Sequence, residues 1–268
     1  MIKIKWLLLP IIAILFTSCN FENEEKTNPT NIKTPTKIEV SCDIKEEDLL
    51  FLTFGQSNAA NSVDEYSTAL TKDLIEIHNN KCYVMNDPLL GTNGDLGTVW
   101  TRLGNLLLDN YPNHKIYFIN TAIAGSAISS WIPGGENNKL LNTKMKMAKQ
   151  MGLEIDMFLW HQGETDAMLN TSLDTYYDNF LLIKDEIDLY FPNTKILMAR
   201  ASKCGDTSSS IIIQAQNLLI SNNYNIYSGP YTDLLGNDYR YDNCHFNGMG
   251  ANYHAVLWYQ EISKLLPR

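Results

Sequence analysis

The sequence predicts an α/β fold, specifically a three-layer α/β/α sandwich around a mainly parallel sheet of five strands. Short apolar runs alternate with longer segments of helical periodicity, which is the order of elements in successive βαβ units. Several short runs are apolar at consecutive positions, as expected for strands buried on both faces. Pro112 and Pro192 follow two of the helical segments, at positions where proline commonly stops a helix.

The expected elements begin after residue 48 and follow in order. The strands are expected at residues 49–54, 115–120, 155–160, 195–199 and 225–227. The helices are expected at residues 99–110, 138–151, 172–190, 207–222 and 248–266. Residues 63–97 are less regular, and we expect loops there with a short strand near Cys82. Right-handed crossovers would then place helices on both faces of the sheet.

The N-terminal segment has the pattern of a leader and is excluded from the fold. Lys3 and Lys5 give a positive start, and residues 6–16 are apolar but too few to span a bilayer. Small residues then precede Cys19. The segment resembles a bacterial lipoprotein signal, whose cleavage would leave Cys19 as the lipid-modified N-terminus. A plain secretory signal with an incidental cysteine is the alternative, and Phe16 is the main departure from the lipoprotein pattern.

The chain is therefore expected to have three parts. Residues 1–18 form the signal peptide, and residues 19–45, rich in Asn, Glu, Lys, Thr and Pro, form a flexible tether. Residues 46–268 form one folded domain. This organisation predicts an exported bacterial lipoprotein, anchored to a membrane through its lipid rather than by a spanning helix.

The charge balance argues against nucleic acid as a partner. Without Lys3 and Lys5, 19 basic residues remain against 30 acidic ones, a net charge of −11. A chain this acidic, with scattered lysines, repels a phosphate backbone.

Four cysteines remain after Cys19, and an exported chain can pair them in three ways. We favour a disulfide between Cys204 and Cys244, because both fall in loops expected on the same rim of the sheet. Cys42 and Cys82 would then form the second bridge. No pair has the CxxC or HxxxH spacing of a zinc site, so no metal or other cofactor is expected.

One serine and one Asp–His pair lie at expected exits from strands. Ser57 follows the first strand by way of Gly55, and the carboxyl edge of such a sheet is where reactive groups gather. Serine is a weak nucleophile and requires a base with an orienting acid. His245 and Asp242, three positions apart in one loop, are the candidate base and its orienter.

Donors for a developing oxyanion are also available from the sequence. Gly125 follows the second strand and could offer its backbone N–H. Gln162 follows the third strand and could offer its side-chain amide. A turn glycine with positive φ is the alternative explanation for Gly125.

Four sequence blocks together resemble the SGNH/GDSL-type hydrolases. The blocks are Gly55-Gln-Ser-Asn58, Gly125, Trp160-His-Gln-Gly-Glu-Thr-Asp166 and Asp242-Asn-Cys-His-Phe246. More narrowly, they are similar to the branch of carbohydrate esterases that holds sialate O-acetylesterases and acetylxylan esterases. The resemblance implies a flavodoxin-like sandwich and a serine esterase that removes O-acetyl groups from acetylated sialic acid or a xylan-type glycan, without a cofactor.

The resemblance also assigns roles by residue. It implies Ser57 as nucleophile, His245 as base and Asp242 as orienter, with Ser57 N–H, Gly125 N–H and Gln162 as the oxyanion hole. The wider superfamily has asparagine where this chain has Gln162. The alternatives are another ester specificity, such as that of a lipase or arylesterase, and a non-catalytic glycan-binding lipoprotein.

Further residues near these blocks are expected to contact substrate or to support the site: Gln56, Asn58, Trp131, His161 and Glu164. Trp131, like Trp100, could stack on a sugar ring or pack in the core. Glu164 and Asp166 could be the paired carboxylates of a glycosidase, but we favour a role in which they support the site by hydrogen bonding. A metal cluster of Asp242, Cys244, His245 and Cys204 is a minor alternative.

Overall fold

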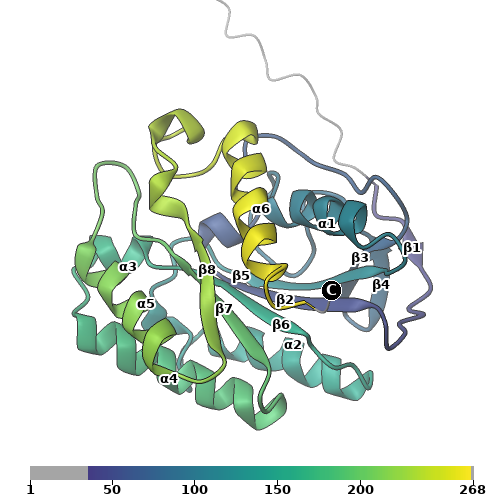
Figure 1. The fold of residues 1–268 in the computed structure, drawn as a ribbon, viewed down its shortest axis with the longest axis horizontal. Coiled ribbons are helices and arrows are strands. Elements are labelled where there is room, and N and C mark those ends of the chain that lie inside the picture. Colours follow the sequence, from purple (N-terminus) through teal and green to yellow (C-terminus); the bar gives the residue numbers. More distant parts are fainter. Residues whose placement is uncertain (1–35, 267–268) are drawn as a thin grey trace, which may run out of the picture. The chain divides into compact units, whose positions relative to one another are not determined.

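A computed structural model of the chain describes residues 36–266, so the expected signal peptide and Cys19 lie outside the described residues. One sheet of eight strands runs through the domain in the order β1-β4-β3-β5-β2-β6-β7-β8 (Figure 1). The strands are β1 (Glu39–Val40), β2 (Leu49–Gly55), β3 (Leu74–His78), β4 (Lys81–Val84), β5 (Ile116–Ala122), β6 (Met157–His161), β7 (Lys195–Arg200) and β8 (Ile226–Tyr231). From β3 to β8 all neighbours are parallel, whereas β4 and β1 are antiparallel additions at one edge.

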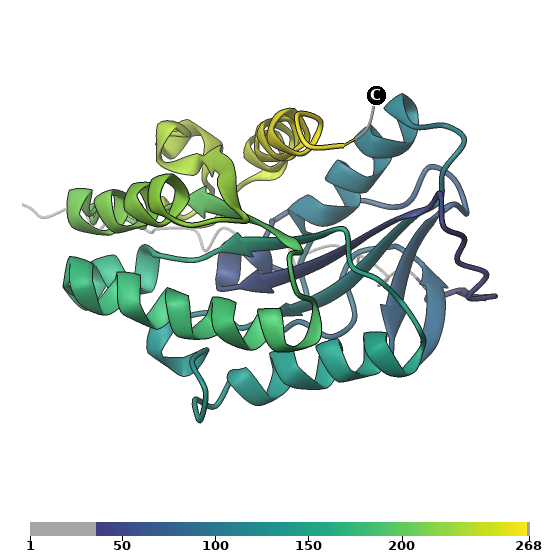
Figure 2. The same ribbon diagram turned by 60° about the horizontal axis from the view of Figure 1, so that its bottom comes forward.

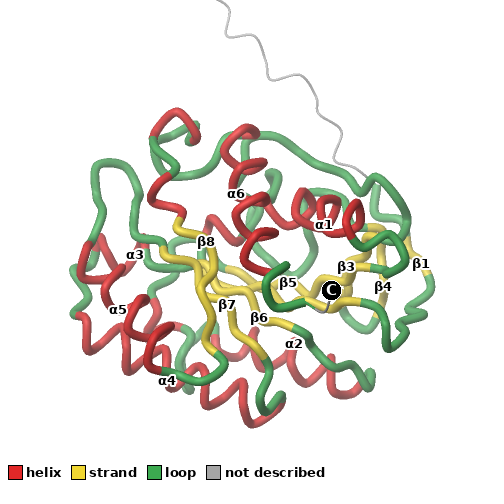
Figure 3. The backbone as a smooth tube through the Cα atoms, in the orientation of Figure 1, coloured by secondary structure: helices red, strands yellow, loops and turns green. Residues whose placement is uncertain are grey.

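Helices cover both faces of the sheet, which gives three layers (Figures 2 and 3). The helices α1 (Val99–Asn110) and α6 (Gly248–Ile262) pack on one face. On the other face lie α2 (Asn138–Gln150), α4 (Leu173–Tyr190) and α5 (Ser210–Asn222). The short α3 (Glu164–Met168) follows β6 directly. Among the described residues no helix is long and apolar enough to cross a bilayer.

Strand β2 is buried along its whole length and contributes side chains to the apolar cores on both faces of the sheet. Leu50, Leu52 and Phe54 pack with the α2, α4 and α5 layer. Leu49 and Phe51 point to the α1 and α6 layer. This period-two alternation between two apolar layers explains why the strand is apolar at consecutive positions.

The α/β class and three-layer arrangement predicted from the sequence are confirmed, but the expected count of five strands is wrong. Strand β3 lies in the segment expected to be mainly loops. It forms a hairpin with β4 through Asn79 and Asn80, whose φ values are +50° and +61°. Asparagine tolerates this left-handed conformation, which two-residue hairpins require.

Strand β1 lies within residues 19–45, which were expected to be a flexible tether. It pairs with β4, and a disulfide between Cys42 and Cys82 fixes the same segment to the sheet. A strand of two residues has too little apolar surface to be visible as a periodic pattern. Ordered structure therefore begins before residue 46.

Candidate active site

The serine loop, residues 55–59, turns sharply at the carboxyl end of β2. Gly55 has a φ of +135°, and a Cβ there would lie 2.1 Å from the His161 carbonyl oxygen. Only glycine fits this position. Ser57 then opens a 3₁₀ turn over Ser57–Ala59. Its side chain is 4% exposed, and among residues 36–266 neither its hydroxyl nor its backbone N–H donates a hydrogen bond. Both groups are therefore available to a ligand.

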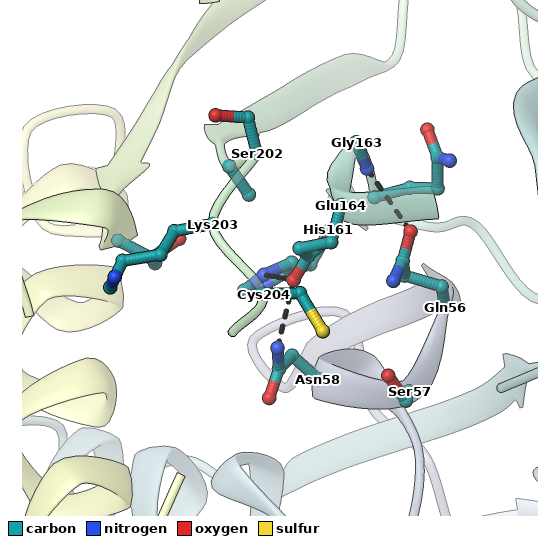
Figure 4. A network of polar contacts seen from close by, with 12 residues as sticks. Gln56, Ser57, Asn58, His161, Gly163, Glu164, Ser202, Lys203 and Cys204 are labelled. Atoms are coloured by element: carbon teal, nitrogen blue, oxygen red, sulfur yellow. Dashed lines mark hydrogen bonds and ion pairs between the residues drawn. The ribbon is translucent and has the colours of Figure 1, made fainter. Parts of the chain in front are cut away.

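The neighbours of Ser57 connect the serine loop to the segment that follows β6 (Figure 4). The Gln56 side-chain carbonyl accepts hydrogen bonds from the N–H groups of Gly163 and Thr165, at 3.3 and 3.1 Å. The Asn58 amide donates to Glu164 Oε1 at 2.8 Å. Gln56 and Asn58 thus hold the loop on both sides of Ser57.

His161 and Glu164 form a buried polar pair beneath this loop. His161 Nε2 bonds to Glu164 Oε1 at 3.1 Å, and His161 Nδ1 lies 3.2 Å from Nε2 of His254. Burial acts to raise the pKa of Glu164, but the charge of His161 and hydrogen bonds from His161 and Asn58 lower it to about 2. Glu164 is therefore a carboxylate acceptor rather than a proton donor.

The Asp242 and His245 side chains meet directly on the loop before α6. His245 Nδ1 lies 2.6 Å from Asp242 Oδ2. The other carboxylate oxygen, Oδ1, accepts from the N–H groups of Cys244 and His245, at 2.9 and 2.6 Å. Partial burial acts to raise the pKa of Asp242, but these hydrogen bonds outweigh it and keep that pKa below its ordinary value. An acid that stays ionised can fix the His245 tautomer, with Nδ1 protonated and Nε2 free to accept a proton.

Two contacts join the loop that carries Asp242 and His245 to the rest of the site. The Asn58 amide donates to the Cys244 carbonyl at 3.3 Å, so the residue after the serine touches the residue before the histidine. Cys244 also forms a disulfide with Cys204, the pairing favoured from the sequence. Between the described residues there is no hydrogen bond from Ser57 Oγ to His245. Such contacts often tighten only when substrate binds.

Gly125 lies on the neighbouring strand exit. Gly55 and Ala122 are register partners on β2 and β5, and Ile123 N–H donates to Gly55 O at 2.9 Å. Gly125 has a φ of +69°, is exposed, and its N–H makes no hydrogen bond to any described residue. Two unpaired N–H groups, on Ser57 and Gly125, therefore flank this sheet edge, as an oxyanion hole requires.

The Gln162 side-chain amide does not point to an oxyanion, as was expected, but donates to groups within the fold. Its amide nitrogen donates to the Ser126 carbonyl at 3.2 Å and to Asp166 Oδ2 at 2.5 Å, and its side chain is fully buried. Both amide hydrogens are thus occupied within the fold. Asp166 Oδ2 also accepts from Ile128 N–H at 2.8 Å. Gln162 and Asp166 therefore hold the loop that carries Gly125.

Several expected alternatives do not fit the structure. Trp131 is 0% exposed and packs edge-on against Phe54 and Trp160, so it belongs to the core and does not stack on a sugar. Trp100 is equally buried. Glu164 and Asp166 are buried and engaged in hydrogen bonds, which removes the glycosidase reading. The sulfurs of Cys204 and Cys244 are bonded to each other and offer no thiolate to a metal.

Two further residues that no sequence pattern pointed to contact the groups described above. Arg240 is buried two residues before Asp242 and donates to the Cys244 carbonyl. His254, on α6, is the ring partner of His161. Neither belongs to a recognisable motif, and only the position of Arg240 two residues before Asp242 could have drawn attention to it.

Comparison with known families gives one match that spans most of the chain. The family described as carbohydrate esterase, sialic acid-specific acetylesterase matches residues 47–255. This range contains all four sequence blocks around Ser57, Gly125, Gln162 and His245. A comparison with curated protein sequences found no significant match.

Solved structures with the same fold include esterases. A protein from Arabidopsis thaliana superposes with a TM-score of 0.65 at 17% identity, covering 82% of this chain and 99% of that one. A carbohydrate acetylesterase from Xanthomonas citri gives 0.60 at 14% identity, covering 81% of this chain and 56% of that one. NanS gives 0.56 at 15% identity, covering 81% and 97%. At these identities the structures establish a shared fold, and the family match establishes membership: the chain belongs to the sialic acid-specific acetylesterase family of carbohydrate esterases.

Proposed function

We propose that this carbohydrate esterase removes O-acetyl groups through a Ser57–His245–Asp242 triad and an acetyl-enzyme intermediate, with acetylated sialic acid as its substrate. The observation that carries the proposal is the 2.6 Å contact between His245 Nδ1 and Asp242 Oδ2 on a loop that Asn58 links to the serine loop. An imidazole oriented in this way is the base that a serine requires.

In the first step Ser57 Oγ attacks the acetyl carbonyl carbon while its proton passes to His245 Nε2. The carbonyl oxygen becomes an oxyanion, which the N–H groups of Ser57 and Gly125 would stabilise. The carbon–oxygen bond to the sugar then breaks, and the sugar oxygen takes the proton from His245. The acetyl group remains on Ser57 as an ester.

In the second step water replaces the sugar. His245 accepts a proton from the water as its oxygen attacks the acetyl-enzyme, and the intermediate collapses with release of acetate. His245 returns the proton to Ser57 Oγ. Asp242, whose low pKa keeps it ionised, stabilises the imidazolium in both steps.

A cavity lies at the same edge of the sheet, but its lining includes none of Ser57, Gly125, Asp242 and His245. Its volume is about 380 Å³, and it opens where β7 and β8 end. Hydroxyl, amide and aromatic groups line it, among them Ser202, Ser209, Asn217 and Tyr231. The buried Ser202 hydroxyl already donates to Asp233 and accepts from the Ser209 N–H, so the cavity does not identify the substrate. The support for an acetylated carbohydrate as the substrate is the family match over residues 47–255.

The substrate is tested by measuring acetate released from O-acetylated sialic acid and from acetylated xylan, with Ser57→Ala as the blank for each. We expect a kcat/KM at least about tenfold higher on the sialic acid, a difference of about 1.4 kcal/mol in transition-state binding. Equal rates, or a preference for xylan, would contradict the proposed substrate. Activity on neither, with aryl acetates also untouched, would contradict the esterase itself.

We also propose that the protein is exported and lipidated at Cys19. The support is the sequence of the leader, with its lysines, apolar stretch and small residues before Cys19. We expect the full chain to sediment with membranes and a Cys19→Ala variant to appear in the soluble fraction. Equal partitioning of the two would overturn this proposal.

A further inference from the structure

The base loop, residues 240–246, exposes Asp242 and His245, the two side chains to which the proposed mechanism assigns proton transfer and its support. The Asp242 side chain is 40% exposed and the His245 side chain 26% exposed. Tyr241 stacks on the His245 ring with centroids 6.0 Å apart, and core packing does not surround the pair. The position of His245 relative to Ser57 must therefore depend on how the backbone of the loop is anchored.

Cys244, directly before the histidine, is the anchoring point. It is buried, and its carbonyl accepts hydrogen bonds from both Asn58 and Arg240. Its N–H donates to Asp242, and its sulfur is bonded to Cys204. Each polar atom of this one residue is thus tied to a different part of the site.

Arg240 connects this anchor to the neighbouring loop. Its Nη1 donates to the Cys244 carbonyl, while Nε and Nη2 donate to the carbonyls of Leu235 and Thr232, both at 3.1 Å. Its guanidinium lies 4.3 Å from the ring centroid of Phe246. A planar fork with fixed N–H directions can hold three carbonyls at once, which the single ammonium of a lysine cannot reproduce.

The charge of Arg240 is unusual in its setting. The side chain is 5% exposed, yet within the described part of the chain no carboxylate lies within ion-pair distance of it. The buried Arg102, by contrast, lies 3.6 Å from Asp87 and 3.3 Å from Glu65. Burial lowers the pKa of Arg240, and the carboxylates of Glu164, Asp233 and Asp242 act against this only from beyond ion-pair distance, so the buried charge is costly. Stability alone gives a weak reason for its presence.

We propose that Arg240 is a positioning residue for His245, acting through the Cys244 carbonyl to fix the Asp242–His245 pair in front of Ser57. This inference rests on the proposed function of His245 as the base. It assigns to Arg240 no contact with substrate. Its effect is instead on how often the imidazole occupies the position from which it can accept the Ser57 proton.

The kinetic test uses Arg240→Met and Arg240→Lys, assayed on an aryl acetate that needs no sugar contacts. We expect kcat to fall about 10–100-fold with KM changed less than about threefold, because a displaced base slows chemistry without removing a binding group. Arg102→Lys is the matched control. It disturbs a buried arginine on α1 whose hydrogen-bond and ion-pair partners all lie outside residues 240–246, and its kcat should stay within about twofold of wild type.

A second measurement is independent of turnover. The proton shared by His245 Nδ1 and Asp242 should give a low-field ¹H NMR signal, assigned by its loss in His245→Ala. We expect this signal to be lost or broadened in both Arg240 variants and retained in Arg102→Lys. If the wild type shows the signal but hydrolyses no ester, the proposed function fails while the positioning role is still decided by the signal.

The inference is overturned if the folded Arg240 variants keep both kcat and the low-field signal. It is equally overturned if kcat falls only in proportion to the unfolded fraction, as measured by circular dichroism. Should Arg240→Met fail to fold, Arg240→Lys retains the buried charge and carries the same test.

Discussion

The serine loop and the base loop hold their reactive side chains in different ways. Around Ser57 the neighbouring side chains are buried, and Gln56 and Asn58 hydrogen-bond to the segment after β6. The base loop leaves Asp242 and His245 partly exposed and is held through the backbone of Cys244. Ser57 thus lies within the buried core, whereas Asp242 and His245 lie on a loop that Cys244 ties to the core.

This difference separates stability from activity. Substitutions in the buried network around Ser57 remove partners from groups that water cannot reach, so they should cost both folding free energy and rate. Substitutions of the exposed pair leave groups that water can solvate, so they should cost rate alone. The predictions below test this separation.

Ser57→Ala is expected to have the largest effect on rate. Loss of the nucleophile should lower kcat/KM by about 10⁴-fold or more on any acetyl ester. The free energy of unfolding should change by less than about 0.5 kcal/mol, because the hydroxyl has no partner among the described residues. Denaturant titration beside the assay checks both. A large loss of stability would show that the hydroxyl has a structural role.

Asp242→Asn is expected to lower kcat by about 10²–10³-fold. The asparagine amide has one acceptor oxygen where the carboxylate has two, so it cannot accept hydrogen bonds at both positions. It also lacks the negative charge that stabilises the imidazolium. Because Asp242 is exposed, water can partly replace the carboxylate in stabilising the imidazolium. The fall in kcat should therefore be smaller than the roughly 10⁴-fold fall typical of a buried acid. Asp238→Asn, an exposed acid on the preceding turn, is the control and should leave kcat unchanged. A similar loss in both variants would contradict the assignment.

Glu164→Gln should affect stability as well as rate. It removes the carboxylate that pairs with His161 and accepts from Asn58. We expect a loss of about 1–3 kcal/mol in the free energy of unfolding and a fall in kcat of about tenfold. Glu154→Gln, which removes an exposed partner of Lys149, should change stability by less than about 1 kcal/mol. Equal free energies of unfolding for the two variants would contradict the claim that the buried network around Ser57 contributes to stability.

The same carboxylate predicts a pH dependence. The pKa of Glu164 is lowered from 4.5 to about 2 in the folded chain. The folded state therefore binds fewer protons than the unfolded state between these values. The stability that Glu164 contributes is present in full above about pH 4.5 and is lost as the pH falls through 2. Denaturant titrations from pH 6 to about pH 2.5 should show this loss in wild type and a flatter profile in Glu164→Gln.

Replacing the disulfides gives the smallest expected effect on rate. Both bridges join residues 40 positions apart, so removing either pair by serine should cost a similar amount, about 2–4 kcal/mol. Only the Cys204/Cys244 double variant should lower kcat, by a few-fold, because Asn58 and Arg240 still hold the Cys244 carbonyl. A fall in kcat for Cys42/Cys82 would show that the effect is global.

The fold was predictable to the extent that its core is periodic. The runs that became β2, β5, β6 and β7 are apolar and sit between helices with clear caps, such as Ser172 at α4 and Ser209 at α5. Strand β1 was missed because it has only two residues, and strand β3 because Glu76 and His78 interrupt its apolar run. Their pairing is fixed by tertiary contacts, including the Cys42–Cys82 bridge.

Within the candidate site, the sequence predicted a contact where both residues belong to one motif. Ser57, Asp242 and His245 are named by sequence, and the structure places the last two in contact. The orientation of Gln162 could not be read from its motif, because it depends on Ser126 and Asp166 as competing acceptors. Arg240 was missed because its role is to hold a backbone carbonyl, and carbonyls carry no sequence signal.

The central claim is that Ser57 carries the acetyl group during turnover. The most direct measurement mixes the enzyme with an aryl acetate, quenches with acid before the steady state, and maps the acetyl group by mass spectrometry of peptides. We expect one acetyl group on the peptide that contains Ser57, at the site of that serine, and none in Ser57→Ala. Wild-type turnover with no acetylated serine, or with the acetyl group on another residue, would contradict it.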